Sequence, residues 1–487
     1  MTTHGKRCGP PAVALVMWCS GGGASRTMNT AGFSTPNNTV ASTATVGADQ
    51  GHFSLKQRAL SGSAWTLSAY VVQQLLRLAG NLVLTRLLVP QHFGLMAIVQ
   101  VFLQGLQMFS DLGIGPAVVR DQRGEEPAFL RTAFTLQVIR GAALWIIVAL
   151  LAWPTAMLYG EPMLAQILPV AGLNALILGF ESTRTRLVKR HLVLGRLNVL
   201  NVVAQAVGLV CTVSLALAYR SVWALVAGSL IVSATRIILG HMVLPGARDG
   251  FGWDRSCFIA IYQFGRVILG SSAVFFVSSQ LDRILLGKYV GMEVLGVYSI
   301  AWMIAHMVVQ ANKSLARQVA FPALSRIHRD QPERMREVYY RTRRSLDWLF
   351  LPGIGVGIGC GMLVIAVLYD PRYLAAGGML QILLIWPAMR CVLEPGEACL
   401  VAMGHPRFAF IQNIVRFCWV IVAVPGGWYL LGLEGVLLAV ASSELPVVPV
   451  IWYGKQKYGI LDLKREAQAA LKLMAGVVVG MFIMSLW

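Results

Sequence analysis

The sequence predicts an all-α polytopic membrane protein with 12–14 transmembrane helices. The chain of 487 residues is 56% hydrophobic and only 13% charged, whereas soluble domains are about 25% charged. Apolar stretches recur from Gly62 to the C-terminus, and each is long enough to cross a bilayer as a helix. Lys and Arg are divided unevenly between alternate connections, as the positive-inside rule requires of such a protein.

The hydrophobic pattern gives thirteen candidate spans. They cover residues 62–87, 93–119, 132–158, 163–187, 194–219, 221–244, 258–285, 293–320, 346–369, 374–400, 407–431, 433–453 and 468–486. The last of these contains Lys472 and is the weakest prediction of the set, because a charge inside a span is costly.

The charge distribution predicts the orientation. When the N-terminus is placed in the cytoplasm, the inner connections carry 24 Lys and Arg and the outer connections carry four. This bias also explains the net charge of +19 without a nucleic-acid partner. Because the outer connections are all short, we expect no enzymatic domain on that side.

Composition and hydropathy divide the chain into four parts. Residues 1–58 are rich in Gly, Ser, Thr and Asn, and we expect a disordered cytoplasmic extension there, with Met28 as an alternative start. Residues 59–250 form a predicted six-helix N-terminal lobe, and residues 251–455 form a C-terminal one. Residues 456–487 supply a basic loop and a possible extra transmembrane helix.

A weak internal repeat supports the division into two lobes. The stretch LTRLLVPQHFGLMAI (84–98) is similar to LDRILLGKYVGMEVLGVYSI (281–300), which aligns Gly94 with Gly296. The offset of about 200 residues corresponds to six spans. An even number of helices in each repeat keeps both halves in one orientation, so we expect an axis along the membrane normal and a substrate path between the lobes.

Polar side chains recur every three or four residues in four of the spans, so they share one helix face. They are Thr66, Tyr70, Gln73, Arg77, Asn81 and Thr85 in the first span; Gln100, Gln104, Gln107 and Asp111 in the second; Asn198, Asn201, Gln205 and Thr212 in the fifth; and Ser299, His306, Gln310 and Arg317 in the eighth. Such faces predict a shared water-filled cavity. Hydrogen bonding between helices is the alternative.

Several arginines lie inside the predicted spans. They are Arg77, Arg140, Arg236, Arg266, Arg390 and Arg416. Arg77 and Arg390 lie near span centres, where an arginine costs about 2.5–3.5 kcal/mol on insertion scales. Glu394 follows Arg390 by four residues, so an ion pair within the helix is one explanation for that arginine. Arg77 has no carboxylate in its own span, so its partner is on another element or is a ligand.

Acidic side chains in the spans suggest coupling or gating roles. Asp111 and Glu181 are candidates for exchanging a proton or binding a cation, and partnership with an arginine is the alternative. Asp282 and Arg283 are adjacent near the outer end of their span and are further candidates.

One glycine-rich stretch resembles a phosphate-binding loop but has another explanation. GIGVGIGCG (353–361) lies inside an apolar span and follows no predicted strand. Gly353, Gly357 and Gly361 are four residues apart, which is typical of close helix packing in membranes. The sequence shows no hydrolase or metalloprotease motif and no CxxC pair, so we expect no catalytic residues, no cofactor and no metal site.

Five stretches resemble the bacterial polysaccharide transporter family, the oligosaccharide flippases. The longest is residues 60–121, which includes the motif from Arg86 to Leu95 and the sequence Asp111-Leu112-Gly113. The others are FESTRTRLVKR (180–190), QLDRILLGKYVG (280–291), LGVYSIAW (295–302) and FPALSRI (321–327). The resemblance extends from about residue 60 to 455.

The resemblance implies two pseudo-symmetric six-helix bundles around a central cavity, as in the multidrug extruders. It also implies movement of polyprenyl-pyrophosphate-linked oligosaccharide repeat units across the bacterial inner membrane, for exopolysaccharide, capsule or O-antigen synthesis. Membrane lipids and polysaccharide polymerase machinery are the implied partners. A peptidoglycan-precursor flippase and a multidrug or cation extruder are the alternatives on the same fold.

An arginine-bearing cavity agrees with such a cargo, because guanidinium groups bind pyrophosphate through paired, charge-assisted hydrogen bonds. Glutamine, asparagine and tyrosine side chains suit sugar hydroxyls. The predicted cavity residues are Gln73, Arg77, Asn81, Gln104, Arg140, Arg266, Arg390 and Arg416.

Overall fold

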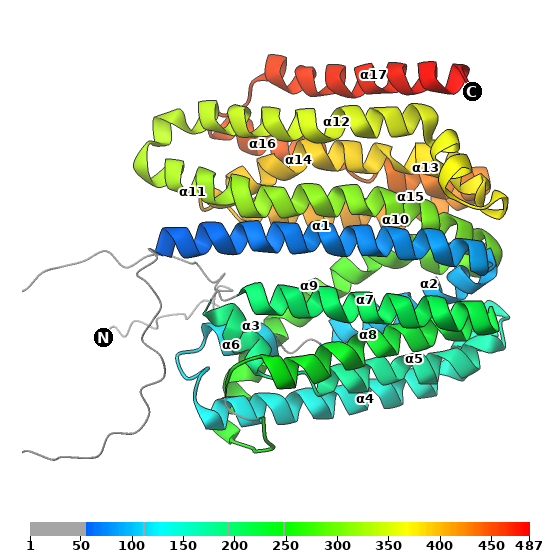
Figure 1. Ribbon diagram of the computed structural model, residues 1–487. Helices are drawn as coiled ribbons and strands as arrows, with labels where there is room; N and C mark the ends of the chain where they lie inside the picture. Colours follow the sequence, from blue (N-terminus) through cyan, green and yellow to red (C-terminus); the bar gives the residue numbers. More distant parts are fainter. Residues whose placement is uncertain (1–54, 111–112, 192–193, 247–248) are drawn as a thin grey trace, which may run out of the picture. The chain divides into compact units, whose positions relative to one another are not determined.

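Long apolar helices make up almost all of the described chain, as the hydropathy pattern predicts. The computed structural model describes residues 55–110, 113–191, 194–246 and 249–487 (Figure 1). The predicted N-terminal extension up to Ser54 and the candidate Asp111 lie outside these residues. The side chain of Arg266 is also outside the described set, although its backbone belongs to a helix.

Seventeen α-helices are present in the described chain, without a β-strand there. The first eight are α1 (Leu55–Leu87), α2 (Pro90–Phe109), α3 (Ile114–Arg120), α4 (Pro127–Tyr159), α5 (Met163–Gly179), α6 (Arg184–Arg190), α7 (Leu194–Tyr219) and α8 (Val222–Val243). The others are α9 (Arg255–Tyr289), α10 (Met292–Leu315), α11 (Phe321–Asp330), α12 (Met335–Leu368), α13 (Ala375–Leu383), α14 (Ile385–Ala402), α15 (Arg407–Ala441), α16 (Val448–Lys457) and α17 (Leu463–Ser485).

Helices lie at all thirteen predicted spans, but fewer segments meet the length and hydropathy expected of a membrane span. In the described part of the chain, ten helical segments are long and apolar enough to cross a bilayer, and α5 with α6 would give an eleventh across a 60° bend. The helices α1 and α9, at the first and seventh predicted spans, are not among these. The predicted boundary between the spans 407–431 and 433–453 falls at Gly432 in α15, which has φ 60° and ψ −131°. A Cβ atom on Gly427 would lie only 2.4 Å from the carbonyl oxygen of Gly435, so the two segments fold back on each other at this glycine.

The helix α9 begins at a side-chain cap outside the apolar region. The Asp254 carboxylate accepts hydrogen bonds from the backbone N–H groups of Ser256 and Cys257, at 2.8 and 3.0 Å, and from the Ser256 hydroxyl. These bonds satisfy donors that the first helical turn leaves free. The Ser256 hydroxyl and the two backbone groups lower the pKa of Asp254 to about 2.

The two copies of the internal repeat touch each other where α2 packs against α10. A Cβ atom on Gly94 would lie 1.8 Å from the carbonyl oxygen of Met292, and one on Gly296 would lie 1.9 Å from that of Pro90. The repeat alignment relates Gly94 to Gly296, and the same offset relates Pro90 to Met292. The contact, which we call the glycine seam, is therefore made by equivalent residues of both halves, at the predicted outer ends of the helices.

Other contacts between the halves reinforce the glycine seam. The Tyr373 hydroxyl donates to the carbonyl oxygen of Leu88 at 3.0 Å, and the Tyr373 ring meets Phe93 edge-on at 6.0 Å. The Tyr159 hydroxyl donates to the carbonyl oxygen of Ile284 at 3.4 Å. The predicted outer ends are thus closed against each other.

The last helix, α17, packs along α12 through glycine, and these two helices lie next to each other in Figure 1. Cβ atoms on Gly355 and Gly359 would lie 2.3 and 2.6 Å from the α17 backbone. Gly476 and Gly480 are equally close to the α12 backbone, at 2.3 and 2.4 Å. Such stripes of small residues allow membrane helices to approach closely.

The prediction that the glycine-rich stretch serves close helix packing is confirmed for two of its three named glycines. Gly357 and Gly361 pack against Leu384 and Gln381, which follow α12 in the chain. Gly353 has no atom within 4 Å of an added Cβ, so it contributes no close contact among the described residues. The closest approaches to α17 come instead from the intervening Gly355 and Gly359, which the sequence analysis did not single out.

Candidate functional site

A first cavity, of about 340 Å³, is formed by α2, α4, α5, α6 and α8. Arg140 lines it and donates through Nε to the Ser110 hydroxyl at 2.9 Å, and through Nη2 to the carbonyl oxygen of Gln107 at 2.7 Å. The Glu181 carboxylate binds Arg236, with 2.5 Å between Oε1 and Nη2. The partnership of Glu181 with an arginine, one of the two roles considered for it, is therefore the arrangement that the structure contains.

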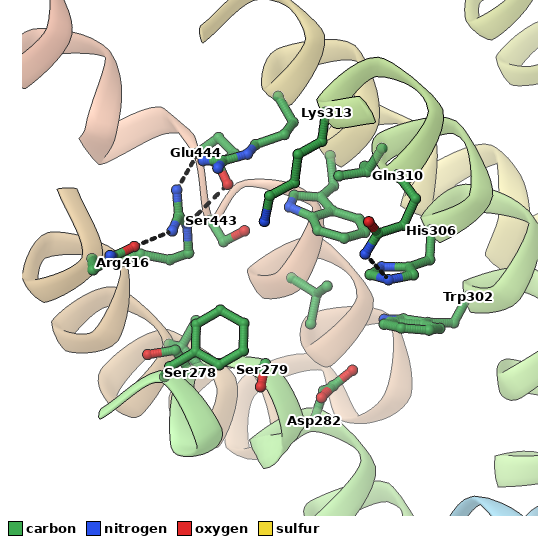
Figure 2. Close-up of a pocket in the computed structure, with 17 residues that line it drawn as sticks. Ser278, Ser279, Asp282, Trp302, His306, Gln310, Lys313, Arg416, Ser443 and Glu444 are labelled. Atoms are coloured by element: carbon green, nitrogen blue, oxygen red, sulfur yellow. Dashed lines mark hydrogen bonds and ion pairs between the residues drawn. The ribbon is translucent and has the colours of Figure 1, made fainter. Parts of the chain in front are cut away.

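A second cavity, of about 160 Å³, lies between α9, α10, α14 and α15 (Figure 2). Its wall is largely apolar, with charged groups from all four of these helices and from the turn after α15. Lys313 and Gln310 of α10 extend into it from one side, and Arg416 approaches Glu444 on the other (Figure 2). The volume admits several water molecules, since one needs about 10–15 Å³ by this measure.

A network of ion pairs borders the second cavity. Arg390 Nη2 lies 2.7 Å from Glu394 Oε2 and 3.4 Å from Glu397 Oε2. Arg416 binds Glu444 in a bidentate manner, with both N–O distances at 2.9 Å. Arg390 Nη1 lies 3.6 Å from Glu444 Oε2, so Glu444 joins α14 to α15. The ion pair between Arg390 and Glu394, which their spacing predicts, is thus confirmed. In the whole network, the three carboxylates of Glu394, Glu397 and Glu444 share two guanidinium groups.

Aromatic rings line the same cavity in a stack. The ring centroids of Trp302 and His306 are 4.2 Å apart, and that of Trp386 lies 5.9 Å from that of His306, all nearly parallel. The Arg283 guanidinium lies 3.7 Å above Trp302, as in a cation–π contact. Asp282, the other predicted gating residue of this pair, accepts a hydrogen bond from the buried Tyr298 hydroxyl.

Arg77 differs from the paired arginines. Its side chain is exposed, and no carboxylate lies within 4.0 Å of it in the described residues. It lines neither cavity, and its connection to the second is an electrostatic interaction with His306. Lys313 lines the second cavity and has no ion pair among the described residues. The second cavity therefore has cationic groups beside it that carboxylates do not neutralise directly.

The remaining predicted cavity residues have varied surroundings. Gln104 accepts a hydrogen bond from Gln280 at 2.9 Å, across α2 and α9. Asn81 Oδ1 is buried and has no hydrogen-bond partner in the described part of the chain. Gln73 is half-buried. The polar stripes do not converge on one cavity here, because Gln107 lines the first cavity and His306 the second.

Some cavity residues were missed by the sequence analysis. Lys313 lies within the predicted span 293–320 and within α10, but it was not among the predicted cavity residues. Trp302 and Trp386 were not distinguished from core aromatics. His306 lies on the predicted stripe of the eighth span, and Trp302 is four residues before it. The position of Trp302 beside that polar stripe could therefore have indicated that it lines the cavity.

Glu444→Gln should destabilise the protein strongly. The carboxylate side chain is 1% exposed and neutralises Arg416 and Arg390 at once. Removal of one partner from a buried ion pair costs about 3–5 kcal/mol because the other charge stays buried. We expect a lower thermal unfolding midpoint for the purified protein in detergent.

Glu434→Gln is the matched control, since Glu434 is exposed in α15, shortly before the turn that holds Glu444. Its unfolding midpoint should equal that of the unmodified protein. An unchanged midpoint for Glu444→Gln would contradict the interpretation of Glu444 as the joint between α14 and α15.

Sequence comparison adds a family assignment to this geometry. A profile described as "Polysaccharide biosynthesis protein" matches residues 83–376, more than half of the chain. The chain is 24% identical over 392 residues to the lipopolysaccharide biosynthesis protein WzxC of Escherichia coli strain K12. That alignment covers 79% of this chain and 78% of WzxC.

Two solved structures share the fold. An inward-facing multidrug resistance MATE family transporter of the MOP superfamily superposes with a TM-score of 0.63 at 14% identity, over 82% of this chain and 98% of that one. The lipid II flippase MurJ in an inward closed conformation gives 0.64 at 12% identity, over 88% and 92%. The predicted multidrug-extruder-like fold is thus confirmed.

Proposed function

Because this chain belongs to the polysaccharide biosynthesis protein family, we propose that it is a flippase for lipid-linked oligosaccharides. It moves polyprenyl-pyrophosphate-linked repeat units from the cytoplasmic to the outer leaflet of the bacterial inner membrane. The family match supports a glycan cargo, and the transporter fold supports movement across the membrane without covalent catalysis. The cargo supplies exopolysaccharide, capsule or O-antigen synthesis, where polymerase machinery is the expected partner.

The observation that carries this proposal is the uncompensated charge of Arg77. A span that holds an arginine without a carboxylate pays an insertion cost of about 2.5–3.5 kcal/mol. A pyrophosphate brings negative oxygens that two guanidinium hydrogen bonds match in geometry and charge. Arg77 lies in electrostatic range of the second cavity, where Lys313 provides another cation. The lipid tail stays in the bilayer while this polar head group crosses.

We place the N-terminus in the cytoplasm, from the bias of 24 inner to four outer basic residues. In this orientation the glycine seam closes the outer side, in agreement with the inward conformations of both similar structures. The lobes 59–250 and 251–455 then alternate between inward-open and outward-open states. Asp111 in the first lobe is the proposed coupling residue, and Asp282 and Arg283 are the proposed gating residues in the second, whereas Glu181 is held in its ion pair with Arg236.

The decisive experiment identifies the lipid-linked glycan that accumulates in cells that lack the protein. Polyprenyl-pyrophosphate oligosaccharide should accumulate on the cytoplasmic leaflet, where enzymes added outside cannot reach it. Accumulation of the glycan on the outer leaflet would contradict the proposal. Accumulation of peptidoglycan precursor, with arrest of wall synthesis, would favour the function named for MurJ.

A multidrug or cation extruder is less well supported. Cationic side chains lie at or beside the second cavity, and they repel a cationic drug. Cells without the protein should therefore keep their normal sensitivity to cationic dyes.

A further inference from the structure

A basic pocket of about 320 Å³ lies where the start of α12 meets the start of α17, and it shares no lining residue with either cavity. Five cationic side chains and two carboxylates line it. The cations are Arg341, Arg343 and Arg344 of α12 with Arg465 and Lys472 of α17. The carboxylates do not balance them, so the pocket carries a positive excess.

The floor of the pocket is a buried charge cluster. Arg343 is 1% exposed and lies 2.5 Å from Glu466 Oε1, which Lys455 also binds at 2.9 Å. Arg343 and Lys472 both approach Asp347 Oδ2, at 3.5 and 3.6 Å. Three buried or nearly buried cations thus share two carboxylates. The guanidinium group of Arg343 is buried at the floor of this cluster.

The rim of the pocket is exposed and cationic. Arg341 and Arg344 are exposed, and neither has a carboxylate within 4.0 Å in the described residues. Arg465 is partly neutralised by Asp462, at 3.5 Å. An anion that enters the pocket therefore meets the exposed guanidinium groups of Arg341 and Arg344 first and the buried Arg343 beneath them.

Apolar surface begins directly beyond the pocket. Trp348 and Leu349 of α12 are 60% and 62% exposed, and Leu471 of α17 is 70% exposed. Trp348 lies seven residues after Arg341, or about 10 Å further along the helix. This order of arginine, tryptophan and leucine follows the passage from head groups to hydrocarbon.

We propose that this basic pocket binds the phosphate of an anionic phospholipid in the cytoplasmic leaflet. Basic pockets between membrane helices on that side are suited to anionic head groups. The exposed Trp348, Leu349 and Leu471 contact the acyl chains. The bound lipid neutralises the excess charge between α12 and α17 and so stabilises their packing. The proposal rests on the orientation given above and is independent of the cargo.

The test uses the full chain, purified in a neutral detergent. Phosphatidylglycerol, phosphatidylcholine or inorganic phosphate is added, and both the thermal unfolding midpoint and the lipid retained in native mass spectra are measured. Phosphatidylglycerol should be retained and should raise the midpoint, as a ligand of the folded state does. The double variant Arg341→Gln/Arg344→Gln should bind it about tenfold more weakly or worse, a loss of about 1.4 kcal/mol.

The matched control is Arg326→Gln/Arg329→Gln, which removes the same charge from exposed positions of α11 outside the pocket. This control should bind phosphatidylglycerol normally. Equal retention of phosphatidylcholine would overturn the proposal, and so would an equal loss of binding in the control. A midpoint raised as much by inorganic phosphate would assign the pocket to free phosphate instead of a lipid.

Discussion

Arg77→Ala should abolish polymer export while the protein still reaches the membrane. Charge-assisted hydrogen bonds contribute about 1.5–3 kcal/mol each. Loss of a bidentate pair therefore slows transport by about a hundredfold or more, at 1.36 kcal/mol for each factor of ten. Folding should not suffer, because the exposed Arg77 has no ion pair among the described residues. The measurement is complementation of a deletion strain, with membrane protein quantified in parallel.

Arg86→Ala is the matched control, because Arg86 is exposed on the same helix but lies at its predicted outer end. It should complement fully. Arg77→Lys should restore only part of the export, since an ammonium group keeps the charge and loses the bidentate geometry. Full export by Arg77→Ala would remove Arg77 from the mechanism.

Gly94→Val should prevent closure of the outer side and stop transport. Even the first side-chain carbon at this position would lie 1.8 Å from the Met292 carbonyl oxygen, so α2 and α10 must separate. Overpacking of this kind costs about 1–3 kcal/mol or more. A two-state equilibrium shifts by up to about a hundredfold for such a cost, away from the inward-facing state.

The shift can be measured by chemical labelling. Leu88 is 1% exposed beside the glycine seam, so a Leu88→Cys reporter should react slowly with a membrane-impermeant thiol reagent in intact cells. Addition of Gly94→Val should raise its reaction rate. Gly240→Val in α8 is the control, because an added Cβ there has no atom within 4 Å. Unchanged labelling in a folded Gly94→Val protein would show that the seam does not govern closure.

Sequence periodicity was sufficient for features that lie within one helix. Hydropathy predicted the spans because a helix must hide its backbone polar groups from lipid wherever it crosses. The break at Gly432 and the ion pair between Arg390 and Glu394 were also predictable, because each depends only on residues close together in the sequence. The doubtful span containing Lys472 is helical in the structure.

Features that join different helices were not predictable. The sequence could not show that Lys472 has Asp347 as a partner, which compensates the charge that made this span doubtful. Nor could it show that Glu444 unites Arg416 with Arg390. The spacing of residues along one helix does not determine how that helix is rotated relative to its neighbours. The same limit explains why the polar stripes do not share one cavity: Gln107 lines the first cavity, His306 lines the second, and Arg77 lines neither.

The glycine seam has a consequence for which substitutions the two halves tolerate. At the seam, backbone meets backbone, so a side chain at Gly94 or Gly296 would force α2 and α10 apart. The interiors of the halves are not held to such a match. The first half holds Arg140 and Glu181 in its cavity, and the second holds stacked aromatic rings beside paired glutamates. The halves are therefore alike where they touch and chemically different where they do not.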